Sequence, residues 1–296
     1  MENVLTLIAA THDGLTDESV AAIRAKLKEI GAHVAAPKWL SAGKACDVNF
    51  GHLAPEQADA AARFVLGKAK VDVVAQGLEN RRKMLLVADM DSTMVVGETL
   101  DELAEYAGIK DRIAAITARA MNGEIGFEAA LRERIGLMAG LPESALAETW
   151  EKTALMPGAQ TLVRTMKANG AYCVLVSGGF TFFTTRVREA CGFDIDLGNR
   201  FIFTDGKLAG VEDPILGRET KLSTLIKTAG ERQIPLALSA AVGDGANDLD
   251  MIKAAGLGVA YQAKPVVAAE ARVRIDHADL TALLYAQGYS DAEFVI

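Results

Sequence analysis

The sequence predicts an α/β protein in which a doubly wound, Rossmann-like parallel sheet carries a helical cap and follows a small ferredoxin-like α+β domain. Apolar runs of strand length alternate with segments of helical period through most of the chain, and this alternation is typical of α/β proteins. A length of 296 residues exceeds what one hydrophobic core usually holds. We therefore expect two domains, each with its own core.

Residues 1–83 are expected to form the smaller domain. Their apolar patterns predict four strands and two helices, at residues 3–10, 20–30, 33–40, 45–50, 55–66 and 71–75. The resulting order, β-α-β-β-α-β, is that of a ferredoxin-like unit. A charged segment at residues 79–83 interrupts the apolar pattern, so we place the boundary there and assign residues 84–296 to the second domain.

Residues 84–94 contain the strongest functional signal. An apolar run too short for a helix leads directly into Asp89 and Asp91, which predicts a buried strand with both carboxylates at its carboxyl end. Ligands of open α/β sheets bind at such ends. Two carboxylates this close repel one another unless a proton or a cation lies between them.

A hard divalent cation, magnesium or calcium, suits these oxygen ligands. An EF-hand calcium loop is excluded, because Met94 and Leu100 occupy the positions where that loop needs glycine and glutamate. Two alternatives remain for Asp89 and Asp91, a magnesium site or a solvated strand end.

Residues 98–157 are expected to form the helical cap. Their apolar residues recur at helical spacing, and Gly108, Gly123 and Gly140 divide the segment. A single crossover helix needs far fewer residues than this. We therefore expect several helices over the edge of the sheet, where a cap excludes water from a site below it.

A second buried strand is predicted at residues 172–176, and it ends in Ser177-Gly178-Gly179 before a helix that begins near Thr181. The amides of a glycine pair at a helix N-terminus approach anions closely, and Ser177 adds a hydroxyl donor. The pattern therefore favours a phosphate-binding loop, with an ordinary loop as the alternative.

The last third of the chain adds a lysine and another carboxylate cluster. Lys221 lies in the first turn of a helix predicted at residues 219–229, where the helix dipole disfavours a cation. It is either a surface lysine or a lysine directed at a bound anion. A third strand, at residues 236–242, leads into Asp244 and Asp248, so carboxylates again follow a strand.

The remaining patterns predict connecting elements. Asp205-Gly206 lies between two apolar runs and predicts a β-hairpin. A helix is expected at residues 249–255. Residues 257–285 are interpreted as a short strand, a Lys264-Pro265 turn and a closing helix.

Composition excludes several classes of function. The formal net charge of -8 argues against a nucleic-acid-binding surface, which requires clustered lysine and arginine. The three cysteines have no repeated spacing, so we expect neither a disulfide framework nor a zinc site. The chain begins without a signal-peptide pattern and has no apolar run of membrane-spanning length. We therefore expect a cytoplasmic protein without nucleic-acid or membrane partners.

The three predicted strand ends together resemble the haloacid dehalogenase superfamily. The residues that match its four motifs are Asp89-Met90-Asp91-Ser92-Thr93, Ser177, Lys221 and Gly243-Asp244-Gly245-Ala246-Asn247-Asp248. Within the superfamily, residues 84–270 are similar to the phosphoserine phosphatase family. The additional matches to that family are Glu98, Phe127 to Arg134, Val176 to Phe180 and Val242 to Met251. Residues 1–83 resemble amino-acid-sensing ACT modules in their element order.

This resemblance implies a phosphomonoester hydrolase that converts O-phosphoserine and water to serine and inorganic phosphate, the last step of serine biosynthesis. It makes Asp89 the nucleophile that forms an aspartyl-phosphate, and it makes Asp91 the general acid and then the general base. It places Mg²⁺ on the side chains of Asp89 and Asp244 and on the backbone carbonyl of Asp91. Asp248 would lie behind these ligands and support them.

The resemblance further implies which residues contact the substrate, namely Glu98, Phe127, Arg134, Ser177, Gly178, Lys221 and Asn247. Ser177, Gly178 and Lys221 would hold the phosphoryl oxygens. Glu98 and Arg134 would face the substrate's ammonium and carboxylate groups, and Phe127 would close the site. By residue type alone, Glu98 and Arg134 are ordinary solvated helix charges, and Phe127 is an ordinary core residue.

Three alternatives remain open. The enzyme would act on another small phosphomonoester, although Glu98 and Arg134 favour an amino acid. A receiver-type phosphoacceptor switch has similar residues at its strand ends, but it must keep a phosphoryl group that Asp91 would help to remove. Residues 1–83 would serve only in assembly or ligand sensing, which leaves room for a homodimer and for an amino-acid effector.

Overall fold

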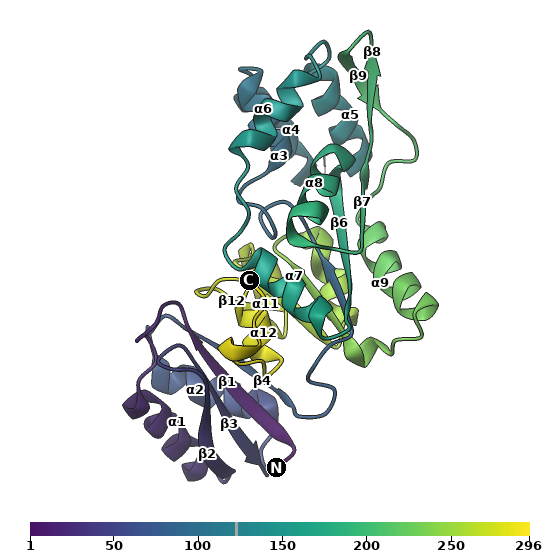
Figure 1. Cartoon of the computed structure of the whole chain (residues 1–296). Helices are drawn as coiled ribbons and strands as arrows, with labels where there is room; N and C mark the ends of the chain where they lie inside the picture. Colours follow the sequence, from purple (N-terminus) through teal and green to yellow (C-terminus); the bar gives the residue numbers. More distant parts are fainter. Residues whose placement is uncertain (122–123) are drawn as a thin grey trace.

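The computed structural model describes residues 1–121 and 124–296 and confirms the predicted fold class. Over these residues, the strands form a four-stranded sheet, a six-stranded sheet and a two-stranded hairpin (Figure 1). Of the three glycines expected to divide the cap, Gly123 lies outside the described residues. None of the described helices is long and apolar enough to cross a membrane.

The four-stranded sheet is formed by the N-terminal part of the chain (Figure 1). Its elements are β1 (Asn3–Ala9), α1 (Asp17–Glu29), β2 (His33–Ser41), β3 (Ala45–Gly51), α2 (Pro55–Leu66) and β4 (Val71–Gly77). The predicted element order is confirmed, and the antiparallel strands lie in the order β2-β3-β1-β4. Leu5 and Leu7 of β1 share a core with Ile23 and Leu27 of α1.

The six-stranded sheet is parallel and doubly wound. Its strands are β5 (Leu85–Ala88), β6 (Tyr172–Phe180), β7 (Ile195–Asn199), β10 (Ser239–Gly243), β11 (Leu257–Tyr261) and β12 (Val273–Ile275). They lie in the order β12-β11-β10-β5-β6-β7, and each neighbouring pair is parallel. The chain leaves β5 toward β6 and β7 and later returns to the other side of β5 at β10. Ligands of such sheets bind outside the carboxyl ends of the strands, at this reversal.

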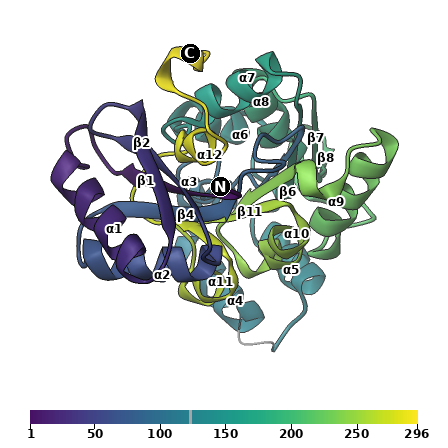
Figure 2. The same cartoon turned by 90° about the horizontal axis from the view of Figure 1, so that it is seen from below.

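The central strand β5 is buried on both faces, as its uninterrupted apolar sequence predicts. The helices around this sheet are α7 (Ala159–Ala168), α8 (Thr181–Cys191), α9 (Glu219–Glu231), α10 (Leu249–Ala254), α11 (Pro265–Glu270) and α12 (Ala282–Ala286). Leu86 and Ala88 share a core with α7 and α8, while Leu85 and Val87 share a core with α9 and α10. Helices therefore cover both faces of the sheet (Figure 2).

The described part of the predicted cap contains four helices, α3 (Thr99–Tyr106), α4 (Lys110–Met121), α5 (Phe127–Leu137) and α6 (Ser144–Lys152). Figure 1 shows them beyond one end of the six-stranded sheet, beside the hairpin of β8 (Phe201–Thr204) and β9 (Lys207–Val211). The hairpin prediction at Asp205-Gly206 is confirmed. The Gly140 N–H donates to the Leu208 carbonyl at 2.8 Å, so this hairpin joins the cap to the core.

The sequence patterns miss both edge strands of the six-stranded sheet. In β7 apolar and polar residues are mixed, and β12 has only three residues with Arg274 at its centre, so neither shows the apolar run of a buried strand. The prediction of a single closing helix is wrong, because β12 separates α11 from α12. The third predicted strand begins later than expected, since residues 236–238 form a 3₁₀ turn before β10.

Candidate active site

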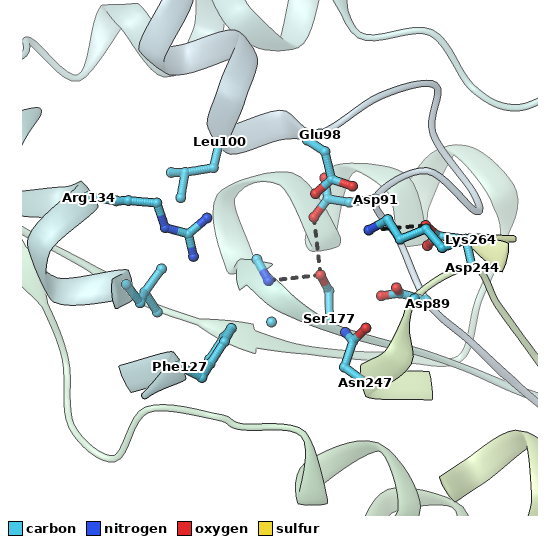
Figure 3. A pocket seen from close by; sticks show the side chains of 14 residues that line it. Asp89, Asp91, Glu98, Leu100, Phe127, Arg134, Ser177, Asp244, Asn247 and Lys264 are labelled. Atoms are coloured by element: carbon cyan, nitrogen blue, oxygen red, sulfur yellow. Dashed lines mark hydrogen bonds and ion pairs between the residues drawn. The ribbon is translucent and has the colours of Figure 1, made fainter. Parts of the chain in front are cut away.

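A pocket lies between the carboxyl ends of β5, β6 and β10 and the helical cap (Figure 3). The residues that line it are Asp89, Asp91, Glu98, Leu100, Phe127, Leu131, Arg134, Ser177, Gly178, Gly179, Asp244, Gly245, Asn247 and Lys264. Lys221 and Asp248, the other two predicted site residues, lie behind this lining. The cavity of about 140 Å³ suits a small molecule, because pockets for drug-sized ligands are larger.

Lys221 is a buried cation of the site. Its Nζ lies 2.8 Å from Asp89 Oδ2 and 2.6 Å from Asp248 Oδ1, and the residue is only 2% exposed. Burial lowers the pKa of Lys221, but the charges of Asp89 and Asp248 outweigh burial and raise the pKa overall. Lys221 therefore stays charged, and the interpretation as a surface lysine is wrong.

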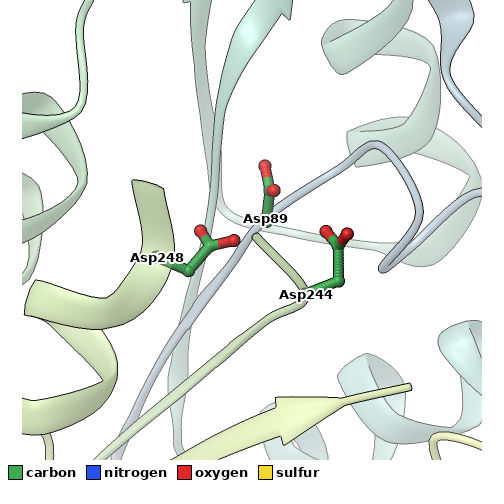
Figure 4. Close-up of side chains that lie close together, drawn as sticks. All are labelled: Asp89, Asp244 and Asp248. Atoms are coloured by element: carbon green, nitrogen blue, oxygen red, sulfur yellow. The ribbon is translucent and has the colours of Figure 1, made fainter. Parts of the chain in front are cut away.

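Asp89, Asp244 and Asp248 form a compact group of buried carboxylates (Figure 4). One carboxylate oxygen from each residue lies within 4.8 Å of those from the other two. Burial raises the pKa of Asp244 and that of Asp248, the latter to about 7, and the charge of Asp89 adds to both shifts. Lys221 and Lys264, whose Nζ lies 3.7 Å from Asp244 Oδ2, are two cations beside three carboxylates, so the group requires a proton or a further cation. Hard oxygen donors at these separations fit a divalent ion such as magnesium.

Asp248 is less available to a metal ion than Asp244. Its Oδ1 accepts a hydrogen bond from Lys221 at 2.6 Å, and its Oδ2 accepts one from the Gly245 N–H at 3.0 Å. The carboxylate of Asp244 has longer contacts, 3.5 Å to Thr93 Oγ1 and 3.7 Å to Lys264 Nζ. These contacts favour the expectation that Asp244 binds the ion while Asp248 supports the site from behind.

Two glycines allow the carboxylates to come close to their neighbours. A Cβ atom at Gly243 would lie 2.2 Å from Asp248 Cγ, and one at Gly179 would lie 2.9 Å from Asp91 Oδ2. Such short contacts do not occur between real side chains, so a side chain at either position would displace a carboxylate. These glycines therefore shape the site itself.

Asp91 is positioned by the cap and by the loop Ser177-Gly178-Gly179. Its Oδ1 accepts the backbone N–H of Thr99, the first residue of α3, at 2.8 Å, and its Oδ2 lies 3.4 Å from Ser177 Oγ (Figure 3). Burial and the charge of Asp89 raise the pKa of Asp91 to about 6, although the Thr99 N–H opposes the shift. Such a carboxyl group exchanges its proton near neutral pH, as a general acid and base must.

The loop Ser177-Gly178-Gly179 lies at the end of β6, facing the pocket. The Gly179 N–H donates to Ser177 Oγ at 2.8 Å, which leaves the hydroxyl hydrogen available to another acceptor. Phe127 of α5 covers the loop, since a Cβ atom at Gly178 would lie 3.2 Å from Phe127 Cζ. Phe127 is 43% exposed and is therefore a cover over the pocket, not a core residue.

Glu98 and Arg134 lie toward the cap side of the pocket, and Figure 3 shows the Arg134 guanidinium pointing into it. Arg134 Nε is shielded from solvent and has no hydrogen-bond partner within residues 1–121 and 124–296. A buried donor without a partner is unfavourable, so this atom indicates an acceptor supplied by a ligand. Glu98 accepts from the Ser92 hydroxyl at 2.9 Å, and desolvation and the charge of Asp91 raise its pKa to about 7.

Sequence reasoning misses Lys264 as a site residue and assigns it to a turn. Its Nζ lies 3.7 Å from Asp244 Oδ2, and the residue lines the pocket. The available signal is its position just after β11, whose carboxyl end lies beside that of β10. Leu100, Leu131 and Gly245 also line the pocket without having been predicted.

Residues 86–253 match the haloacid dehalogenase-like hydrolase family. The match covers more than half of the chain and includes all three strand ends that meet at the pocket. The protein belongs to this family. Its pocket lies at the carboxyl ends of the parallel strands, where ligands of such folds bind.

Curated relatives of the chain include several phosphoserine phosphatases. One from Streptomyces coelicolor is 37% identical over 293 residues, which cover 97% of this chain and 72% of the relative. Another, from Haemophilus influenzae, is 43% identical over 201 residues, which cover 68% of this chain and 64% of the relative. For several of these relatives, the alignment with this chain spans only 57% to 64% of their own length.

Solved structures with the same architecture cover nearly the whole chain. A haloacid dehalogenase family hydrolase from Salmonella enterica serovar Typhi has a TM-score of 0.83 at 28% identity, and the match covers 96% of this chain and 98% of that one. A probable phosphoserine phosphatase from Vibrio cholerae has a TM-score of 0.79 at 28% identity, with coverage of 99% and 88%. Both sheets of this protein therefore occur together in related structures.

Proposed function

We propose that the protein hydrolyses O-phosphoserine to serine and inorganic phosphate. The observation that carries this proposal is the arrangement of charges in one small pocket. Asp89 and Lys221 form a buried ion pair at one end. Glu98 lies toward the cap, as does Arg134 Nε, which has no hydrogen-bond partner among the described residues. Phosphoserine has matching groups, a phosphoryl ester at one end and an ammonium and a carboxylate at the other. The phosphoserine phosphatases among the relatives support the same substrate. Its hydrolysis would be the last step of serine biosynthesis.

The first half of the reaction would transfer the phosphoryl group to Asp89. One carboxylate oxygen of Asp89 forms a bond to phosphorus while the bond from phosphorus to the serine oxygen breaks. Asp91 gives its proton to the departing serine oxygen. A pKa raised to about 6 allows Asp91 to hold this proton before the reaction begins.

The second half would return Asp89 to its free state. A water molecule attacks the phosphorus of the aspartyl-phosphate, and the now ionised Asp91 accepts a proton from that water. The bond between phosphorus and the Asp89 oxygen breaks, and inorganic phosphate leaves. The same residue would therefore serve first as the acid and then as the base.

The phosphoryl oxygens would be held by the Lys221 ammonium, the Ser177 hydroxyl and the Gly178 amide. Phosphoryl transfer depends mainly on positioning and on balancing charge at these oxygens. Lys221 also lies beside the proposed nucleophile, because its Nζ is 2.8 Å from the Asp89 carboxylate. An acidic protein can thus bind an anion through a few buried donors.

We infer that Mg²⁺ binds at the side chains of Asp89 and Asp244 and at the backbone carbonyl of Asp91. The compact group of carboxylates and the long contacts of Asp244 support this assignment. The ion would supply additional positive charge at the phosphoryl oxygens. Asp248 would hold Lys221 in place from behind.

Selectivity for an amino acid would come from the cap side of the pocket. Glu98 would pair with the substrate's ammonium group and Arg134 with its carboxylate. Phe127 would close over the Ser177-Gly178-Gly179 loop, and Asn247, which also lines the pocket, would contact the bound substrate. A phosphomonoester without these two charged groups would therefore bind less well.

We further propose that residues 1–83 form a regulatory domain and residues 84–296 a catalytic domain, with the cap at about 98–157. In support, Asp72 of β4 accepts the backbone N–H groups that follow β12, those of Asp276 and Ala278 at 2.8 Å each. An effector bound by the first sheet would thus have a direct connection to the second. Amino acids should therefore alter the activity or the oligomeric state of the full chain. If a panel of them changes neither, this regulatory assignment fails.

The assay that tests the hydrolysis is phosphate release from phosphoserine and from a panel of other phosphomonoesters, with magnesium and with a chelator. We expect phosphoserine to have the highest kcat/KM, activity to require magnesium, and Asp89→Asn to be inactive while folded. A higher kcat/KM for a phosphomonoester without an amino-acid group would refute phosphoserine as the preferred substrate, while phosphomonoester hydrolysis would still stand. Release from no substrate would refute the reaction itself.

A further inference from the structure

Asn199 is a buried side chain that contacts the phosphate loop from outside the pocket. It is the last residue of β7 and is 2% exposed. Its Nδ2 donates to the Gly178 carbonyl at 2.8 Å, and its Oδ1 accepts the backbone N–H of Leu216 at 2.8 Å. Because a carbonyl only accepts and a backbone N–H only donates, these partners determine which way the Asn199 amide is turned.

The bond to Gly178 constrains the peptide that joins Gly178 to Gly179. This peptide is planar, and its N–H is donated to Ser177 Oγ at 2.8 Å. With one side of the hydroxyl occupied in this way, Ser177 directs its hydrogen elsewhere, here toward Asp91 Oδ2 at 3.4 Å. Asn199 therefore controls, through one rigid peptide, the direction in which Ser177 donates.

The loop needs this support because it leaves the strand ladder. The pairing of β6 with β7 is irregular between Val176 and Phe180, and it resumes where Phe180 pairs with Asn199. Peptides in such an irregularity lose their ladder partners, and the Asn199 side chain supplies one to Gly178. The strand also lies very close to the loop, since a Cβ atom at Gly198 would be 3.2 Å from the Gly179 carbonyl oxygen.

The second bond of Asn199 extends toward Lys221. Leu216, whose N–H is accepted by Asn199, lies just before α9, and Lys221 is in the first turn of that helix. Lys221 in turn lies 2.8 Å from the Asp89 carboxylate. One buried amide therefore joins the Ser177 loop to the segment that leads to Lys221, the two sources of donors for a phosphoryl group.

We propose that Asn199 is a positioning residue for phosphoryl transfer. It holds the Ser177-Gly178 loop and the segment that leads to Lys221 in fixed positions relative to the Asp89 carboxylate. The inference rests on the phosphomonoester hydrolysis proposed above. The loop faces the phosphoryl group and not the rest of the substrate. Asn199 therefore affects the rate for every phosphomonoester alike, without affecting the choice between them.

The sharpest variant is Asn199→Asp, because aspartate has the same shape. It keeps an acceptor for Leu216 and replaces the donor to Gly178 with an oxygen that repels the carbonyl. We expect kcat per folded molecule to fall by roughly ten- to a hundredfold, as for other misplaced catalytic groups, with a smaller change in KM. The same factor is expected for phosphoserine and for phosphoethanolamine, which has no carboxylate.

A matched control is Gln160→Ala. Gln160 Nε2 donates to the Ala190 carbonyl at 2.9 Å, which joins α7 to α8 away from the pocket. This variant loses a comparable side-chain to backbone bond, so it should lower the melting temperature and leave kcat unchanged. A purely structural role for Asn199 would produce the same pattern as Gln160.

A double-mutant cycle tests whether Asn199 acts through the Ser177 hydroxyl. In a Ser177→Ala background, Asn199→Asp should lower kcat by a clearly smaller factor than in the wild-type background. If the two factors are equal, or if folded Asn199→Asp keeps the wild-type kcat, the proposal is refuted. A loss confined to phosphoserine would refute it as well.

A second variant, Asn199→Ser, removes both hydrogen bonds of the Asn199 amide without adding a charge. The same measurements can be made on it if Asn199→Asp does not fold. Wild-type protein that releases no phosphate from any substrate would be a failure of the proposed function. Active wild-type protein with unaffected Asn199 variants would be a failure of the positioning role only.

Discussion

The Lys221 ammonium lies 2.8 Å from the Asp89 carboxylate, in a site where both residues are buried. The cation therefore lies against the carboxylate that attacks phosphorus in the proposed reaction. Burial and the charge of Asp89 raise the pKa of neighbouring Asp91 to about 6. A general acid must hold a proton before it can donate it, so this raised pKa suits the role proposed for Asp91.

Replacing Lys221 should damage both stability and activity. Lys221→Met leaves two buried carboxylates without their partner, so we expect a loss of about 3–5 kcal/mol in the free energy of unfolding in metal-free buffer. Activity should fall by a factor on the order of 100 to 1,000, because a donor to the phosphoryl oxygens is lost. Urea unfolding and phosphate release measure these effects.

The matched control is Lys227→Met on the same helix. Lys227 has a side chain that is 75% exposed, and its Nζ lies 3.9 Å from Glu231 Oε1. Its loss should therefore change neither the free energy of unfolding nor the rate of phosphate release appreciably. Equal stability of the Lys221 and Lys227 variants would contradict the assignment of Lys221 as a buried structural and functional cation.

Asp91→Asn should leave the nucleophile in place and remove proton transfer. We expect kcat to fall by roughly a hundredfold to ten-thousandfold, with the melting temperature close to that of the wild type. Steady-state phosphate release from phosphoserine is the measurement. A rate near that of the wild type would mean that the Asp91 side chain is not the acid and that the residue contributes only its backbone carbonyl.

Arg134→Ala should alter substrate preference. Loss of a charge-assisted bond to the substrate carboxylate is worth about 1.5 to 3 kcal/mol, or roughly ten- to a hundred-and-fifty-fold in kcat/KM for phosphoserine. Phosphoethanolamine never forms that bond, so its kcat/KM should hardly change. The ratio of the two substrates is therefore the informative quantity.

The control for Arg134 is Arg132→Ala, slightly earlier on α5. Arg132 is exposed and pairs with Glu128 and Asp213 at the surface, so its removal should leave the substrate ratio unchanged. If Arg134→Ala lowers kcat/KM for both substrates by the same factor, Arg134 supports the cap and does not recognise a carboxylate.

Without metal, the protein should become less stable as pH rises from about 4 to about 7. The pKa of Asp91 is raised to about 6, and those of Glu98 and Asp248 are raised to about 7. Glu98 is exposed to solvent, which screens its charge, so its contribution is the smallest of the three. Because these values exceed the ordinary ones, the folded protein binds more protons than the unfolded chain in this window. The free energy of unfolding therefore falls as those protons are lost.

Melting temperatures across this pH range, in chelator and in magnesium, test the argument. Magnesium should replace the missing positive charge, so it should raise the melting temperature most at the upper end of the window. Asp248→Asn removes one of the three groups and should make the slope in chelator less steep. A melting temperature that rises steadily with pH in chelator would show that the carboxylates are balanced without protons or metal.

Several residues that line the pocket were readable from local sequence. Asp89, Ser177 and Asp244 each follow a buried apolar run, and the carboxyl ends of parallel strands meet at one edge of the sheet. Apolar runs therefore located the strand ends, and the strand ends located the pocket. The order of elements in residues 1–83 was readable for the same reason, because strands with a period of two and helices with a period of about 3.6 differ in pattern.

Tertiary packing decided the parts of the site that no local pattern marks. Lys221 could equally have been a surface lysine, and only the docking of α9 against β5 buries it beside Asp89. The cap helices orient Arg134 toward the pocket, a direction that helical spacing does not specify. Asn199 ends an edge strand of mixed apolar and polar residues, so its two hydrogen bonds appear only when β7, the phosphate loop and the segment before α9 come together. Contacts between segments far apart in the chain depend on packing, and a local pattern contains no information about them.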